Sequence, residues 1–134
     1  MSDAALAIAN IKALYCATAD LGAEHPEAAR AQFGTIFSDD FFGDFGMATF
    51  DRGEAMTDFL CTVINANAEW MVHMLGSPRI TINGDTAKGD WTVLVWSKRR
   101  EGGEPMRVIG RYSDEFRRTA DGWKISRIAF RQYQ

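Results

Sequence analysis

Residues 110–130 have the sequence GRYSDEFRRTADGWKISRIAF, and this stretch decides the fold because it contains two strand patterns joined by a tight turn. β-Branched and aromatic residues lie on both sides of Ala120-Asp121-Gly122, a sequence typical of a hairpin turn. The two patterns extend over Met106–Thr119 and Gly122–Tyr133. Strands of about ten residues or more twist and curl, so we expect a long, curved antiparallel hairpin.

Three more strand patterns precede this hairpin, at Trp70–Leu75, Arg79–Asn83 and Lys88–Lys98. The connections Asn83-Gly84-Asp85 and Arg100–Glu104 are rich in glycine and polar residues, as hairpin turns are. Five such patterns in succession predict an antiparallel meander in the second half of the chain.

The first half of the chain has the three- and four-residue spacing of apolar residues that is typical of helices. A first helix is predicted over Ala4–Ala19, with Gly22 as its stop. A second helix is predicted to begin around Pro26, which suits a first helical turn, and to end near Ser38-Asp39-Asp40.

The segment after the second helix, Phe41–Gly46, is too aromatic and too rich in glycine for a helix and predicts a short strand with a turn. A third helix is predicted from about Arg52 to Asn67, with Asp51 as its N-cap and Glu54 completing a variant capping box. The predicted buried stripe of this helix consists of Met56, Phe59, Leu60, Val63 and Ile64.

Three helices followed by a meander define an α+β fold. Helices that pack on the concave side of a curled sheet would enclose a pocket. A chain of 134 residues has the usual length of one domain, so a single domain over residues 1–134 is expected.

Composition argues against several classes of partner. The net charge is −3, from 15 basic and 18 acidic groups, and there is no basic stripe of the kind that nucleic-acid binders carry. The basic clusters Lys98–Arg100 and Arg117–Arg118 have acids nearby, Asp114 among them, and are interpreted as solvated hairpin ends. No apolar run approaches the roughly 20 residues of a membrane helix, and the N-terminus has no secretory pattern.

Cysteine and histidine usage predicts a reducing, cytoplasmic location and chemistry without metal. Cys16 and Cys61 are isolated and have no zinc-like spacing, so free buried thiols are expected. Two histidines without acids at ligand spacing argue against a metal site. No phosphate- or dinucleotide-binding glycine pattern occurs, and no cofactor is expected.

His73 is the strongest candidate for chemistry. It lies in the apolar run Trp70–Gly76, whereas the other histidine, His25, lies in a polar connection. Imidazole is the side chain that exchanges protons near neutral pH. On an apolar strand, His73 is either a hydrogen-bonded core residue or a proton-transfer group that faces a cavity.

Five motifs occur in an order that is known from one protein family. They are Ile8-x-x-Ile11-x-x-x-Tyr15-Cys16-x-x-x-Asp20, His73 followed by Arg79, Ile80-x-Ile82-x-Gly84-Asp85-x-Ala87, Tyr112–Phe116 and Asp121–Ile125. Over nearly its whole length the chain resembles the family of nuclear transport factors and ketosteroid isomerases. Within it, the chain is most similar to the SnoaL-like branch with scytalone dehydratase, bile acid 7α-dehydratase and hexachlorocyclohexane dehydrochlorinase.

This resemblance implies a fold and an assembly. Three helices would pack on a strongly curved, mixed but mostly antiparallel sheet, which together form a cone with an internal pocket. The protein would be a homodimer or homotrimer. The outer face of the sheet, with Trp91 or Trp96 and Arg127 or Arg131, would form the interface.

The resemblance also implies a pair of catalytic residues, Asp20 and His73. Dehydratases and the dehydrochlorinase of this family pair a histidine with an aspartate from the end of the first helix. A carboxylate that accepts one imidazole N–H sets the tautomer and leaves the other nitrogen free to take a substrate proton. Otherwise Asp20 is an exposed acid at a helix end, and a register counted from Ile11 would instead put Thr18 and Ala23 in the key places.

Tyr15, Tyr112 and Phe130 are implied to contact the substrate. Tyr15 matches a pocket tyrosine of the bile acid dehydratases, and its phenol can polarise a carbonyl or protonate a leaving hydroxyl. Strand alternation groups Tyr112 with Gly110 and Asp114 on one face, which the resemblance places inward, and Gly110 would leave space for a ligand. Plain core packing is the alternative for both tyrosines.

The last strand contributes an apolar inner wall. Ile128 stands where the dehydrochlorinase has a pocket arginine, and Phe130 and Gln132 share its face. Arg127 and Arg131 are expected on the outer face. This pattern argues against dehalogenation and favours a neutral, apolar or aromatic small molecule as the ligand.

The expected function is a cofactor-independent lyase of the dehydratase type, or an isomerase, that acts on a small apolar cyclic or polyketide- or steroid-like compound. The alternative is a non-catalytic small-molecule-binding domain, or a small subunit that supports a partner enzyme such as a ring-hydroxylating dioxygenase. A hydrogen bond between Asp20 and His73 in a sealed pocket favours catalysis. A His73 ring bonded to a backbone carbonyl, with Asp20 in solvent, favours the alternative.

Overall fold

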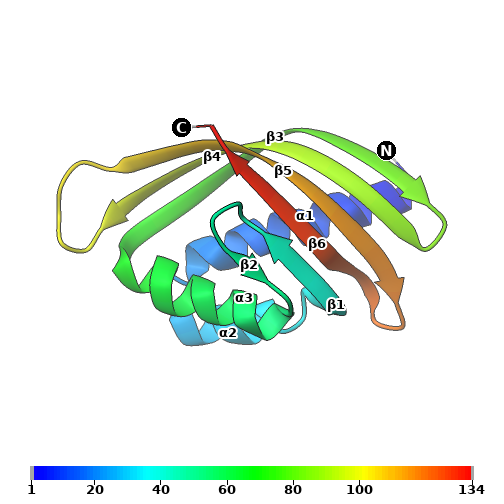
Figure 1. Ribbon diagram of the computed structural model, residues 1–134, viewed down its shortest axis with the longest axis horizontal. Helices are drawn as coiled ribbons and strands as arrows, with labels where there is room; N and C mark the ends of the chain where they lie inside the picture. Colours follow the sequence, from blue (N-terminus) through cyan, green and yellow to red (C-terminus); the bar gives the residue numbers. More distant parts are fainter. Residues whose placement is uncertain (1, 134) are drawn as a thin grey trace.

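The computed structural model describes residues 2–133, which form three α-helices and six β-strands (Figure 1). The helices are α1 (Asp3–Leu21), α2 (Pro26–Phe33) and α3 (Gly53–Phe59), and α3 continues as a π-helical turn over Leu60–Ile64 and a 3₁₀ turn over Asn65–Asn67. The strands are β1 (Phe37–Asp44), β2 (Thr49–Phe50), β3 (Ala68–Asn83), β4 (Thr86–Arg99), β5 (Met106–Thr119) and β6 (Gly122–Gln132).

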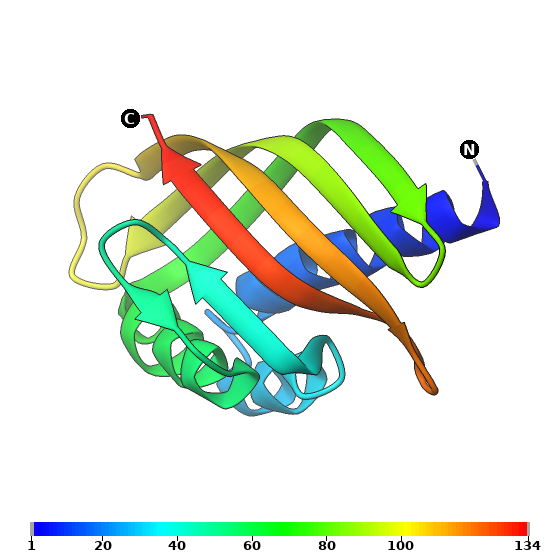
Figure 2. The same ribbon diagram turned by 45° about the vertical axis from the view of Figure 1, so that its right-hand side comes forward.

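All six strands form one sheet in the order β2-β1-β6-β5-β4-β3. Neighbouring strands are antiparallel except β1 and β6, which are parallel. The sheet is curved and open, and the helices lie on its concave side, with α1 packed against β3 (Figures 1 and 2). The predicted α+β class, with three helices on a mixed but mostly antiparallel sheet, is confirmed. The internal pocket and the domain limits at residues 1–134 stay predictions.

α1 follows the sequence pattern closely. The Ser2 hydroxyl caps it by accepting a hydrogen bond from the Ala5 amide at 3.1 Å, and Gly22 is its C-cap. Ile8, Lys12 and Tyr15, spaced four and three residues apart, are all buried on the face that packs against the sheet.

By length and composition alone, α1 would also pass as a membrane-crossing helix, because it has 19 residues and a window with a mean hydropathy of 1.3. A core helix meets the same criterion, and residues along α1 are buried in this fold. The expectation that no apolar run approaches such a length therefore does not hold for α1.

The second helix is shorter than predicted. α2 ends at Phe33 and β1 begins at Phe37, so Ser38-Asp39-Asp40 lies in a strand rather than at a helix end. The Ile36 carbonyl accepts a hydrogen bond from the Ile125 amide at 2.9 Å, next to the parallel pairing of β1 with β6. The spacing of residues within this segment could not predict the pairing, because the partner strand of β1 is β6, at the other end of the chain.

The third helix starts and continues differently from the prediction. Its N-cap is Arg52 and makes no side-chain cap hydrogen bond, so the predicted cap by Asp51 with Glu54 is wrong. The π-helical turn then rotates the inward face. As a result Cys61 is buried, whereas Val63 of the predicted stripe is 47% exposed.

The strand predictions hold, with one merger. Trp70–Leu75 and Arg79–Asn83 are parts of the single strand β3, which has an irregularity between Gly76 and Arg79. The turn between β5 and β6 depends on Gly122, whose φ of +102° lies in the region that favours glycine.

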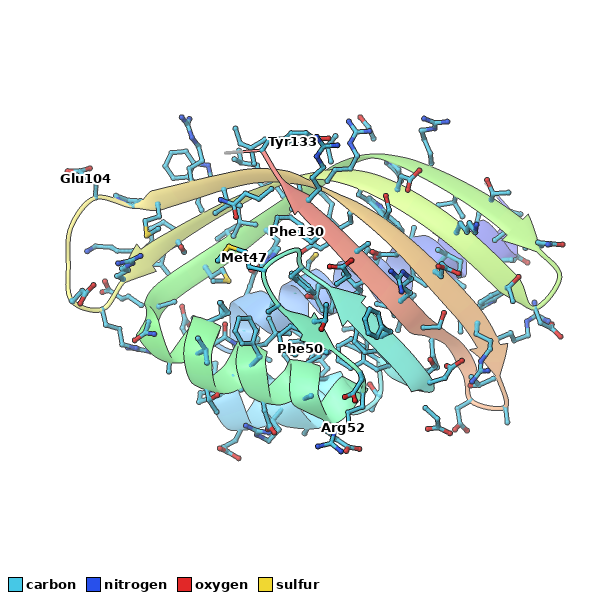
Figure 3. The ribbon with its side chains drawn as sticks, in the orientation of Figure 1. Met47, Phe50, Arg52, Glu104, Phe130 and Tyr133 are labelled. Carbon is cyan, nitrogen blue, oxygen red and sulfur yellow. The ribbon has the colours of Figure 1, made fainter. Side chains whose placement is uncertain are left out.

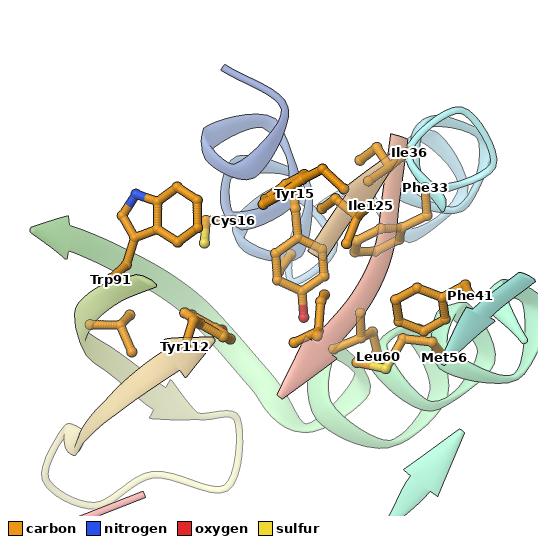
Figure 4. Packing of buried hydrophobic residues seen from close by; sticks show 14 of the residues in the cluster. Tyr15, Cys16, Phe33, Ile36, Phe41, Met56, Leu60, Trp91, Tyr112 and Ile125 are labelled. Atoms are coloured by element: carbon orange, nitrogen blue, oxygen red, sulfur yellow. The ribbon is translucent and has the colours of Figure 1, made fainter. Parts of the chain in front are cut away.

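The core fills the space between the helices and the concave face of the sheet (Figure 4). Its centre is aromatic: Phe37 packs against Phe41 with ring centroids 4.4 Å apart, and Tyr15 lies 6.0 Å from Phe33. Cys16 and Cys61 are free, buried thiols, as predicted. A cytoplasmic location stays a prediction.

Candidate active site

Asp20 and His73 meet where the last turn of α1 faces β3. Asp20 Oδ1 lies 2.7 Å from His73 Nδ1, and Asp20 Oδ2 accepts a hydrogen bond from the backbone amide of His73 at 3.0 Å. The side chain of His73 is 9% exposed and that of Asp20 is 25% exposed. One carboxylate therefore holds both the ring and the backbone of His73.

This geometry selects one tautomer of His73. An ionised carboxylate only accepts hydrogen bonds, so Nδ1 carries the proton and Nε2 keeps its lone pair. Asp20 is near a helix C-terminus, where the helix dipole disfavours negative charge, and the two donors of His73 offset that cost. The pair can take up a proton at Nε2 while Asp20 stabilises the resulting imidazolium.

The residues of the alternative register do not reach His73. The Thr18 hydroxyl donates to the Leu14 carbonyl at 2.7 Å, and both Thr18 and Ala23 are buried. The ring partner of His73 is thus the Asp20 carboxylate rather than a backbone carbonyl.

Tyr15 of α1 and Tyr112 of β5 meet in the core (Figure 4). Their rings stand edge to face, with centroids 6.3 Å apart, and the two residues are 1% and 3% exposed. Burial above all raises the pKa of both phenols well above the ordinary value, and nearby Cys16 and Asp114 add to the rise. A phenol is already protonated at neutral pH, and this rise keeps both groups protonated at higher pH as well.

Phe130 is half-buried and packs on Tyr112, with ring centroids 5.2 Å apart. It also closes the space beside Gly110: a Cβ on Gly110 would lie 2.6 Å from the Phe130 ring and from the Arg131 carbonyl oxygen. The predicted room for a ligand at Gly110 is wrong, because the missing side chain makes space for Phe130 itself.

A second charged pair, which the sequence analysis missed, lies deeper in the core. Lys12 Nζ is 2.7 Å from Asp114 Oδ2, and both side chains are 0% exposed. Lys12 Nζ also lies 3.3 Å from the ring centroid of Tyr112 and 4.5 Å from that of Tyr15. Apart from this ion pair, neither Nζ nor the carboxylate oxygens have a hydrogen-bond partner of good geometry among residues 2–133.

Asp114 is near the basic cluster Arg117–Arg118 in the sequence, but its side chain lies in the core and not among the solvated charges of that hairpin end. Asp114 shares its strand face with Gly110 and Tyr112, as the alternation predicted, and that face is buried. The sequence also contains a sign of the partner of Asp114. Lys12 falls on the apolar stripe of α1 between Ile8 and Tyr15, where a charged side chain is unusual.

Burial governs the titration of this interior. It raises the pKa of Asp114 to about 6, and Lys12 offsets part of the rise. It also raises the pKa of the Cys16 thiol to about 12, which makes a thiolate nucleophile unavailable there. Among residues 2–133, no group of three His, Cys, Asp or Glu side chains comes together in a way that could hold a metal.

The outer face of the sheet carries the arginines, as predicted. Arg127 pairs with Glu115 at 3.8 Å, and Ile128 is fully buried on the inner face. Of the two tryptophans considered for an oligomer interface, Trp91 is excluded because it is 3% exposed and packs on Phe116 inside the fold. A homodimer or homotrimer stays a prediction.

The sequence matches the profile of the SnoaL-like domain over residues 1–129. The chain belongs to the SnoaL-like domain family. No curated protein has a sequence that matches this chain significantly.

Solved structures share the SnoaL-like fold of this chain. A Novosphingobium aromaticivorans protein provisionally assigned as an aromatic ring hydroxylase has 26% identity and a TM-score of 0.84, covering 98% of this chain and 90% of its own. A protein of the same organism provisionally assigned as a scytalone dehydratase has 20% identity and a TM-score of 0.83, covering 100% and 89%. A type 2 hexachlorocyclohexane dehydrochlorinase, LinA, has 20% identity and a TM-score of 0.79, covering 99% and 90%.

Proposed function

We propose that this SnoaL-like protein is a cofactor-independent lyase or isomerase in which His73, held by Asp20, removes a proton from carbon. The observation that carries the proposal is the double contact between these residues, 2.7 Å at the ring and 3.0 Å at the backbone. The names of two similar structures, a scytalone dehydratase and a dehydrochlorinase, denote eliminations and support this reaction class.

The first choice of reaction is dehydration. His73 Nε2 takes a proton from the carbon next to a carbonyl, the C–H electrons form a carbon–carbon double bond, and the C–O bond to the hydroxyl breaks. The proton returns from the imidazolium to the leaving hydroxyl, which departs as water. Double-bond isomerisation is the second choice and differs in that the proton returns to another carbon.

Tyr15 and Tyr112 are proposed as donors to the oxygen on which charge develops. Their raised pKa values keep both phenols protonated, which a donor requires. Phe130 and Ile128 add apolar surface to the same side of the sheet, so we propose a small apolar cyclic or polyketide- or steroid-like substrate.

A panel of hydroxylated cyclic ketones, polyketide-like phenols and steroids tests this proposal. Mass spectrometry detects the loss of water, and absorbance detects the migration of a double bond. We expect His73→Ala to lower turnover of any converted compound by about 100-fold or more. His25→Ala is the matched control, because His25 is exposed at the start of α2. Unchanged turnover in a folded His73→Ala protein would contradict the proposal.

A second candidate is a non-catalytic small-molecule-binding domain, or a subunit that supports a ring-hydroxylating enzyme. The similarity to the protein provisionally assigned as an aromatic ring hydroxylase favours it. In that case compounds of the same panel bind without conversion, and His73→Ala leaves their affinity unchanged. Binding and turnover measured on the same samples separate the two candidates.

A further inference from the structure

We propose that the outer face of the sheet carries a separate site, a groove that binds a small carboxylate-bearing molecule between Arg111 and Arg131. The groove has a volume of about 800 Å³ and lies between β5, β6 and the connection from β1 to β2. Small-molecule sites commonly have such volumes. This inference does not depend on the reaction proposed for Asp20 and His73. It requires that the oligomer interface predicted for this face uses Arg127 and leaves Arg131 free.

The two arginines face each other across neighbouring strands. Arg111 of β5 is paired in register with Arg131 of β6, and both side chains are exposed. Side chains directly opposite each other are about 5 Å apart at Cβ, and like charges in such a pair are destabilising. Among residues 2–133, no carboxylate lies within 4.0 Å of either guanidinium.

The neighbouring charges on this face are already engaged or recessed. Arg127, the preceding arginine on the outer face of β6, pairs with Glu115. The carboxylate of Asp44, on the rim of the groove, accepts a hydrogen bond from the Gly46 amide at 2.9 Å. Asp90, which is opposite Ser113 in the register, is half-buried. Asp44 keeps its negative charge, but the lining has two arginines and only this one carboxylate, so the groove keeps a net positive charge that favours an external anion.

The rest of the groove suits an organic anion. Its lining combines the Ser113 hydroxyl and the small side chain of Ala129 with the apolar surfaces of Met47 and Tyr133. Met47 is fully exposed on the β1–β2 connection, and Tyr133 lies at the end of β6 (Figure 3). The Arg131 guanidinium lies 5.0 Å from the Tyr133 ring centroid.

These features define the class of ligand. A guanidinium is a planar fork of N–H donors that can bind both oxygens of a carboxylate, and the two arginines offset the charge of such a ligand. The apolar walls beside them favour a carboxylate with an aromatic or aliphatic body over a small inorganic anion.

An NMR titration at constant ionic strength tests the site with benzoate as the probe. Benzyl alcohol is the neutral analogue, and inorganic phosphate is the competing anion. We expect saturable shifts with benzoate, and affinity that falls about tenfold in Arg111→Gln and in Arg131→Gln. Arg107→Gln is the matched control, because Arg107 is exposed on the same strand but lies over Trp96, outside the groove. His73→Ala should bind benzoate like the wild type.

Three results would overturn the site: equal benzoate affinity in the wild type and both groove variants, equal binding of benzyl alcohol, or tighter binding of phosphate than of benzoate. The melting temperature without ligand gives an independent readout. Each groove variant should melt at or above the wild-type temperature, because the like-charge contact is gone, and a fall in both variants would contradict the repulsion on which the site rests.

Discussion

Two acid–base pairs join α1 to the sheet at the same distance but in different surroundings. Asp20 and His73 are 2.7 Å apart at the end of α1, with side chains 25% and 9% exposed. Lys12 and Asp114 are also 2.7 Å apart, but both are 0% exposed. A contact distance therefore does not distinguish a partly exposed pair from a pair that is closed off from solvent in the core.

The surroundings make the difference. At the end of α1, a partly exposed pair can gain and lose a proton, which general acid–base chemistry requires. In the core, desolvation penalises each charge, and each group depends on the other for compensation. We expect the first pair to matter mainly for turnover and the second mainly for stability.

The largest expected effect comes from breaking the interior pair on one side. Lys12→Met leaves Asp114 without its counterion, and Asp114→Leu leaves Lys12 without its own. Each single variant should lose about 3–5 kcal/mol of unfolding free energy in urea titrations. The double variant Lys12→Met/Asp114→Leu should recover most of the loss, because apolar residues of similar size need no compensation. A double variant as unstable as the singles would show that the pair contributes more than mutual neutralisation.

Acid titration tests the same pair in the unmodified protein. Burial raises the pKa of Asp114 to about 6 from an ordinary 3.8, so the folded state binds this proton more tightly than the unfolded chain. The contribution of this group to stability is therefore fully present below the unfolded pKa and is lost as the pH rises through about 6. We expect a fall of no more than about 3 kcal/mol over this range.

The measurement is urea unfolding of the wild type and of Lys12→Met/Asp114→Leu at a series of pH values. Subtracting the two curves removes the other carboxylates, among them Asp40, whose pKa is lowered by its hydrogen bond from Ser38. The quantity of interest is the unfolding free energy of the wild type minus that of the double variant. If this difference rises between about pH 4 and 6, the raised pKa of Asp114 is contradicted.

The smallest expected loss of stability comes from the pair at the end of α1. Asp20→Ala removes two hydrogen bonds to His73, but the carboxylate is a quarter exposed and already partly hydrated. We expect a loss of about 1–2 kcal/mol of unfolding free energy. Asp39→Ala, at an exposed position of β1, is the control and should stay within about 0.5 kcal/mol of the wild type. A loss for Asp20→Ala as large as for Lys12→Met would erase the contrast between the pairs.

Much of the fold could be predicted because its signals are local. The alternation that placed Tyr112 and Asp114 on one face, and the glycine turn at Gly122, hold in the structure. The stripe of α1 from Ile8 to Tyr15 also holds. The failures occur where distant contacts decide, at the early start of β1, which pairs with β6, and at the π-helical turn that exposes Val63.

The candidate site divides in the same way. Family motifs identified Asp20 and His73, and the structure brings their side chains together. The role of Gly110 was misjudged, because the ring that occupies its vacant side belongs to Phe130 of the next strand. The Lys12–Asp114 pair was missed, because a charged side chain on an apolar stripe shows its partner only after folding.

By itself, the sequence determined which faces of its helices and strands are apolar and where the chain turns, because these depend on residue spacing and backbone geometry. Only the tertiary structure decided which charges meet and how much water reaches them. The order of the strands and the curvature of the sheet bring Lys12 beside Asp114 in the dry core and Asp20 beside His73 at its margin. Burial is a property of the assembled layers, and it separates a charge pair closed off from solvent from a pair that solvent can reach.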